Sequence, residues 1–231
     1  MKNLVSYFDV PFDDKSITLS TLIAFATDHY QRLIALNTGG RYDERISALQ
    51  AVLAQFKQSD SENMIHLGKR KASKQSKGRL RRSIVQGIAR LAAHVIVAYG
   101  SKGPEYKLCF PNGRRLFSVC RDDVLKIHLN ALHQSLIKLQ DGLDPEVITR
   151  AAALVSDWQA VHAASETATA RKAHAEVNLR TARKALQLEL FHSLLEIIRH
   201  HPRQPGILNR YMQPHLLRSR RKRKQETEPT D

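Results

Sequence analysis

Residues 145–199 read PEVITRAAALVSDWQAVHAASETATARKAHAEVNLRTARKALQLELFHSLLEIIR, with no proline after the first position. Steps of alternately four and three residues visit an apolar series that is interrupted only by Ser165 and Lys172. This spacing is typical of a long amphipathic helix with a coiled-coil-like seam. Asp144 and Pro145 suit the N-cap and first turn, so we predict one helix over the quoted stretch. The seam comprises Val147, Ala151, Leu154, Trp158, Val161, Ser165, Ala168, Lys172, Ala175, Leu179, Ala182 and Leu186.

A second long stretch, 41–99, also lacks proline and has helical periodicity. Its two apolar segments, 46–56 and 84–99, are separated by a polar segment that contains two glycines. Each interior glycine costs a helix roughly 1 kcal/mol relative to alanine. Residues 59–62, Ser-Asp-Ser-Glu, also resemble a capping box that would begin a new helix. The sequence of 41–99 is therefore compatible either with one bent helix or with two consecutive helices.

Shorter elements are expected around these two stretches. Ser16 is a candidate N-cap for a first helix that ends before the turn at 37–40. Residues 121–140 have a leucine face that predicts another helix. Residues 100–119 do not have the pattern of a helix. Because Phe-Pro-Asn-Gly at 110–113 is typical of a turn, we expect a short hairpin or an ordered loop there.

Both long stretches run from apolar to polar and back to apolar, which suggests how they pair. Laid antiparallel, 46–56 would meet 186–198, and 84–99 would meet 147–161. We therefore predict an all-α fold, an elongated antiparallel helical bundle with two apolar lobes and a polar waist. The alternative is a compact bundle in which the chain folds back at Gly68 or Gly78. The expected organisation is an irregular arm at 1–15, a single helical-bundle domain at 16–217 and a disordered basic and polar tail at 218–231.

The segment 104–114 reads PEYKLCFPNGR and precedes a helix and then a long alanine-rich helix. In this order of elements and in its Tyr…Phe-Pro-x-Gly turn, the chain resembles a loose group of uncharacterised bacterial helical-bundle proteins. The resemblance implies an all-α fold. It implies no activity.

The charge of the chain is concentrated in two short segments. There are 37 Lys and Arg residues against 22 Asp and Glu residues, a net charge of +15. Without these two segments the chain is nearly neutral, so each is a candidate binding surface for a polyanion. Their basic residues are Lys69, Arg70, Lys71, Lys74, Lys77, Arg79, Arg81 and Arg82 in the first, and Arg218, Arg220, Arg221, Lys222, Arg223 and Lys224 in the second.

The ligand suggested by these basic segments is nucleic acid, bound through its phosphates. No aromatic residue lies within 69–82, so stacking on bases is not built into this segment. A solvated helix face would have the same composition. Runs like 218–224 serve as nuclear signals, RNA-binding arms or solubilising tails, and the pattern alone does not rank them.

Other site classes have weak support. Glu189 and His192 form a single E-x-x-H, whereas di-iron bundles use two such motifs. His192, Glu196 and His200 share a helix face, but an amphipathic helix gives that spacing without a metal. No nucleophile-elbow, zincin or dinucleotide motif occurs. We therefore expect no catalytic residues, no metal and no cofactor.

The cellular context follows from composition. Two cysteines make no disulfide framework, and no leader or membrane-spanning run is visible in the sequence, so we expect a cytoplasmic protein. The favoured interpretation is a non-enzymatic binding or scaffold protein that binds nucleic acid non-specifically through its basic patches. The alternative is a protein–protein interaction scaffold or self-associating structural protein, a homo-oligomer joined through the alanine seam, with no nucleic-acid role.

Overall fold

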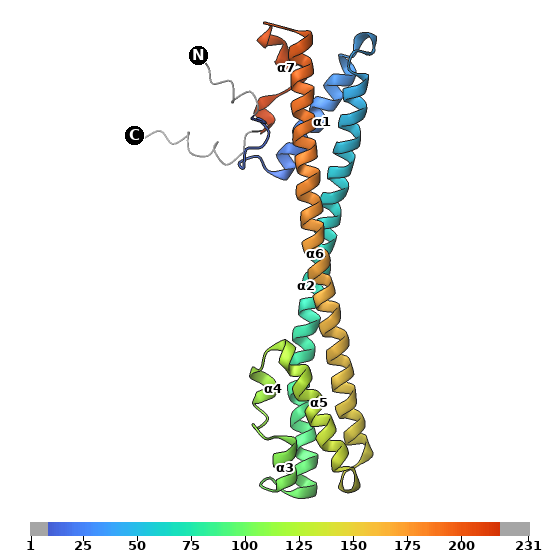
Figure 1. The fold of residues 1–231 in the computed structure, drawn as a ribbon, viewed down its shortest axis with the longest axis vertical. Coiled ribbons are helices and arrows are strands. Elements are labelled where there is room, and N and C mark those ends of the chain that lie inside the picture. Colours follow the sequence, from blue (N-terminus) through green and yellow to red (C-terminus); the bar gives the residue numbers. More distant parts are fainter. Residues whose placement is uncertain (1–8, 218–231) are drawn as a thin grey trace, which may run out of the picture. The chain divides into compact units, whose positions relative to one another are not determined.

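The computed structural model describes residues 9–217, and within them every regular element is helical (Figure 1). This confirms the all-α class. The two long stretches are the helices α2 and α6, and the others are short. In chain order the elements are α1 (Leu19–Ala35), η2 (Thr38–Gly40), α2 (Asp43–Tyr99), α3 (Pro104–Cys109), α4 (Leu116–Val119), α5 (Asp122–Lys138), η3 (Gln140–Gly142), α6 (Pro145–His200), η4 (Pro205–Ile207), α7 (Leu208–Tyr211) and η5 (Pro214–Leu217).

Within the described residues the chain divides into two compact units. Unit 1 is formed by residues up to 64 and from 174 onward, and unit 2 by residues 65–173. Both α2 and α6 contribute to each unit. The division has a physical reason, since the large apolar side chains of these helices gather in two separate clusters.

The polar segment of α2 continues as one helix, which settles the choice between one helix and two. Gly68 and Gly78 lie inside the helix, and the chain does not fold back at either. The residues that resembled a capping box are helical as well. Ser61 donates its hydroxyl proton to the carbonyl oxygen of Lys57 at 3.0 Å, and Gln58 donates to the Glu62 carboxylate at 2.9 Å. These side chains are therefore satisfied without a new helix start.

Unit 1 is built on the start of α2 and the end of α6, with α1 lying against both (Figure 1). The residues before α1 close one side of this core through two buried side chains, Phe12 and Ile17. The helix α1 begins at Leu19, with Thr18 as its N-cap instead of the predicted Ser16. The reason is local, because the Ser16 N–H donates to the Asp14 carboxylate at 2.7 Å. The α2 and α6 residues of the core include Leu49, Leu53, Phe56, Leu186, Leu190 and Ile197.

A buried histidine fastens the C-terminal segment of unit 1 to α1. The ring of His29 is fully buried, and its Nδ1 lies 2.8 Å from the carbonyl oxygen of Tyr211. A carbonyl only accepts, so Nδ1 carries the proton and donates. The other ring nitrogen, Nε2, is buried without a hydrogen-bond partner. Burial lowers the pKa of His29 to about 4, although the Tyr211 carbonyl and the nearby Asp28 both favour the charged form.

Unit 2 contains the middle and end of α2, the three helices that follow it, and the first half of α6. Its core joins α2 residues such as Ile84 and Ile88 to Trp158 of α6. Both α3 and α4 pack on α5 (Figure 1). Of the two alternatives for 100–119, the hairpin is wrong, because no strand occurs within residues 9–217, and the stretch expected to be non-helical contains the helices α3 and α4.

The start of α6 agrees with the sequence prediction. The carboxylate of Asp144 accepts the Glu146 N–H at 2.8 Å, so it caps the helix that begins at Pro145. Across residues 9–217, none of the helices combines the length and the apolarity that crossing a bilayer requires.

Candidate nucleic-acid interface

The first basic segment lies entirely on α2 and within unit 2. Helical geometry distributes its eight cations around the helix, so they do not share one environment. Five are exposed, namely Lys69, Lys71, Lys74, Arg79 and Arg82, and three are half-buried, namely Arg70, Lys77 and Arg81. The sequence-predicted site therefore separates into an outer and an inner set.

Two of the inner cations hold the N-terminus of α5. The Lys77 ammonium lies 2.9 Å from the Asp122 carboxylate, and Arg81 pairs with the same carboxylate. Arg81 also donates to the carbonyl oxygens of Cys120 and, at 3.4 Å, of Ser118. Because Asp122 is the first residue of α5, these contacts fasten the junction between α4 and α5 to α2.

The charge of this cluster is balanced. Burial alone would raise the pKa of the Asp122 carboxyl, but the hydrogen bonds and charges of Lys77 and Arg81 outweigh burial and lower that pKa. Glu166 of α6 adds a second carboxylate, 3.8 Å from the Lys77 ammonium. Lys77 and Arg81 therefore have structural partners that compete with an external phosphate.

The five exposed cations are in a different state. Within residues 9–217, no hydrogen bond or ion pair engages the side chain of Lys69, Lys71, Lys74, Arg79 or Arg82. The part of α2 from residue 63 to 99 also contains no Asp or Glu. These side chains are free to neutralise an anion without first breaking an internal pair.

Arg70, the third member of the inner set, is not among the cations that pair with Asp122. It is half-buried, and its Nε is buried without a hydrogen-bond partner. The second basic run, Arg218, Arg220, Arg221, Lys222, Arg223 and Lys224, lies outside the described residues.

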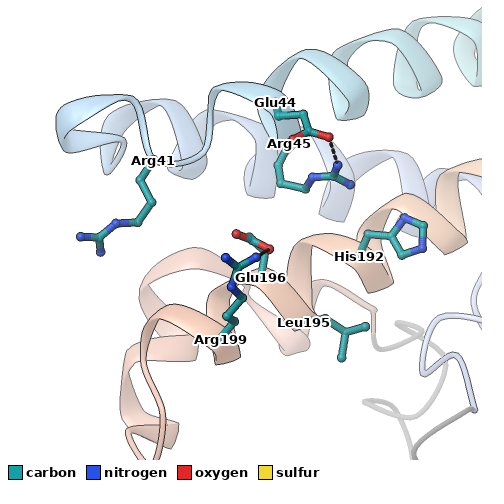
Figure 2. Close-up of a pocket in the computed structure, with 7 residues that line it drawn as sticks. All are labelled: Arg41, Glu44, Arg45, His192, Leu195, Glu196 and Arg199. Carbon is teal, nitrogen blue, oxygen red and sulfur yellow. Dashed lines mark hydrogen bonds and ion pairs between the residues drawn. The ribbon is translucent and has the colours of Figure 1, made fainter.

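Two members of the α6 stripe, His192 and Glu196, line a cavity of about 390 Å³ in unit 1, and His200 does not (Figure 2). Several charged side chains of the cavity pair with each other or with Glu189 and His200 beside it. Arg45 contacts Glu44 at 2.7 Å and Glu189 at 3.1 Å, and Glu196 contacts His200 at 3.0 Å. Across residues 9–217, no group of three or more His, Cys, Asp and Glu side chains is placed to hold a metal ion.

The two cysteines are free thiols. Cys109 is buried, and burial raises its pKa to about 11, which makes its thiolate scarce at neutral pH. Cys120 is half-buried, and its carbonyl oxygen accepts from Arg81.

The role of Asp122 was not apparent from the sequence, since it lies more than forty residues after its partners. The only nearby sequence feature that could have pointed to this role is the acidic pair Asp122-Asp123 in the first turn of α5. Acidic residues are common at helix starts, so the pair does not identify a partner. A comparison of the chain with family models, curated proteins and solved structures finds no match in any of the three.

Proposed function

We propose that this chain is a non-enzymatic protein that binds nucleic acid through the exposed cations of α2. The observation that carries the proposal is the part of α2 from residue 63 to 99, which has no Asp or Glu and bears five exposed cations without an internal partner among residues 9–217. Phosphates are the anions that nucleic acid presents at regular spacing, and Lys and Arg neutralise them with release of counterions.

Binding of this kind reads no sequence. Contacts to phosphate fix position, whereas base identity is read by side chains that reach base edges. The five cations of the outer set are long and flexible, and the segment 69–82 contains no aromatic side chain. We therefore propose that affinity is electrostatic and falls steeply with salt.

The test is binding of labelled DNA and RNA over a range of roughly 50 to 200 mM salt. In the test variant Lys69, Lys71, Lys74, Arg79 and Arg82 become Gln, whereas Lys77 and Arg81 are kept for their structural role. The log–log salt slope is expected to flatten by about 4, because each lost phosphate contact removes about 0.7 to 0.9. A matched control carries the same charge change at other exposed cations, Lys57, Lys107, Lys138, Arg180 and Lys184. Equal slopes for the two variants would refute the proposed surface.

The alternative, self-association through the alanine seam, receives no support from burial. Ala151, Leu179, Ala182 and Leu186 are all buried in the chain's own clusters. These four seam residues are therefore covered by the chain itself.

We also propose that α2 and α6 run antiparallel within each unit. The proposal is supported by the two cores, because the start of α2 shares one core with the end of α6, and the later part of α2 shares the other core with the first half of α6.

A further inference from the structure

A row of exposed polar residues continues along α2 beyond the basic segment. Its members follow one another at spacings of three or four residues, so they lie on one face of the helix. None of them is acidic, and the row is about 28 Å long. These residues, the α2 stripe, are Lys71, Gln75, Arg79, Arg82, Gln86 and Arg90.

The stripe ends in a groove within unit 2, where α2 faces the first part of α6. The groove has a volume of about 370 Å³, and Gln86 and Arg90 line it from α2. Arg150 lines it from α6, and one of its N–H groups donates to the Glu146 carboxylate at 2.7 Å. A guanidinium has five N–H donors, so Arg150 keeps several for a ligand. No carboxylate lines the groove.

Apolar atoms also line this groove. They come from Leu91, Ala153 and Leu154, and Gly87 lies among them. A Cβ atom at position 87 would lie 3.1 and 3.2 Å from the two terminal methyl groups of Leu154. Glycine therefore allows α2 to approach Leu154 closely, and no α2 side chain fills the groove at this point.

This combination matches the chemistry of a nucleobase. A base has flat faces that pack on apolar groups and on guanidinium planes, and its polar edges accept and donate hydrogen bonds. Ser83 and Gln86 supply such hydrogen-bonding groups at the rim. A base that is paired in a duplex cannot enter a groove of this kind without leaving the stack.

We propose that the ligand is single-stranded nucleic acid, with its phosphates along the α2 stripe and one of its bases in this groove. The inference rests on the proposed function, because it requires the cations of α2 to bind phosphates. It adds a preference for unpaired strands and a contact to a base that the basic segment alone does not supply.

The test follows binding by the fluorescence anisotropy of three labelled ligands of about 20 nucleotides each. They are a single strand, a duplex and an abasic single strand. The parent chain is expected to bind the single strand roughly tenfold more tightly than the abasic strand, because a stacked base contributes about 1–3 kcal/mol. Equal affinity for these two strands would overturn the base contact. Tighter binding of the duplex than of the single strand would overturn it as well.

Two variants locate the contact. Ala153→Trp fills the groove and keeps every cation, and it should weaken single-strand binding roughly tenfold while leaving duplex binding unchanged. Ala160→Trp is the matched control, since Ala160 is an exposed alanine of α6 outside the groove. If circular dichroism shows that Ala153→Trp perturbs the fold, the double variant Arg90→Gln and Arg150→Gln tests the groove instead, because both arginines line it. Single-strand binding by these variants equal to that of the control would refute the groove.

The outcomes separate the two proposals. A parent chain that binds neither strand nor duplex refutes the proposed function together with this inference. A parent chain that binds both equally, and loses binding only when the outer cations are neutralised, supports the proposed function and refutes the groove.

Discussion

Lowering the pH from 7 to about 4 is expected to reduce the free energy of unfolding by about 3 kcal/mol through His29 alone. The ring is buried between α1 and the C-terminal segment, and its pKa is lowered from 6.5 to about 4. Protonation would place a second N–H on Nε2, which has no hydrogen-bond partner in its buried position. The charged ring therefore destabilises unit 1.

The sign follows from the two pKa values. Between pH 6.5 and about pH 4 the unfolded chain binds a proton that the folded chain does not bind, so stability rises with pH. The contribution is complete above pH 6.5 and is lost as the pH falls toward 4. Each unit of pKa difference corresponds to about 1.4 kcal/mol.

Urea unfolding followed by far-UV circular dichroism at several pH values measures this effect. Other groups titrate in the same range, so the comparison is with His29→Gln, which cannot titrate and retains an N–H donor for the Tyr211 carbonyl. The parent should lose about 3 kcal/mol more than the variant between pH 7 and about pH 4. Parallel pH profiles for the two proteins would show that His29 is not the titrating group.

Replacing Asp122 by Asn is expected to destabilise unit 2 by about 2 kcal/mol. The change removes the charged acceptor from Lys77 and Arg81, whose side chains are only 19% and 23% exposed. Breaking a fully buried pair by removing one partner costs about 3–5 kcal/mol, and partial exposure reduces this figure.

The neighbouring carboxylate supplies the control. Asp123 pairs with Arg121 at 3.0 Å, but both side chains are largely exposed, so Asp123→Asn should change stability by less than about 0.5 kcal/mol. The chain has one tryptophan, and Trp158 lies in the core of unit 2, so its fluorescence during urea unfolding reports on this unit. Equal midpoints for the two variants would show that Asp122 does not hold α5 in place.

The long helices could be predicted because their signals are repeated many times along the chain. The seam of α6 recurs once in every turn of the helix, and Asp144 marks where that helix begins. The continuity of α2 could not be predicted, because two glycines and a capping-box pattern argued for a break. Inside the helix their cost is limited to about 1 kcal/mol per glycine, and Ser61 bonds to a carbonyl four residues earlier.

The hairpin alternative for 100–119 was wrong because a short segment can fit both the two-residue period of a strand and the 3.6-residue period of a helix. Tyr106, Leu108 and Phe110 alternate as a strand would, but Tyr106, Cys109 and Phe110 also share a helix face. The structure takes the second pattern, with Pro104 in the first turn of α3 and Cys109 and Phe110 buried. The turn residues were identified correctly, and only the flanking elements were not.

The basic segment could be found from composition, but its division into two sets could not. Which cations face inward depends on the partner that packs against α2, and Asp122 comes from a helix more than forty residues away. The groove at Arg90 was equally hidden, because Arg150 reaches it from α6.

The division of the chain between the two units determines the order in which they can fold during synthesis. Unit 2 is one continuous segment, complete when residue 173 has been made. Unit 1 needs Leu186, Leu190 and Ile197, which are made later, to cover the apolar faces of α1 and the start of α2. The helix α1 therefore waits, with its apolar face uncovered, until the end of α6 has left the ribosome.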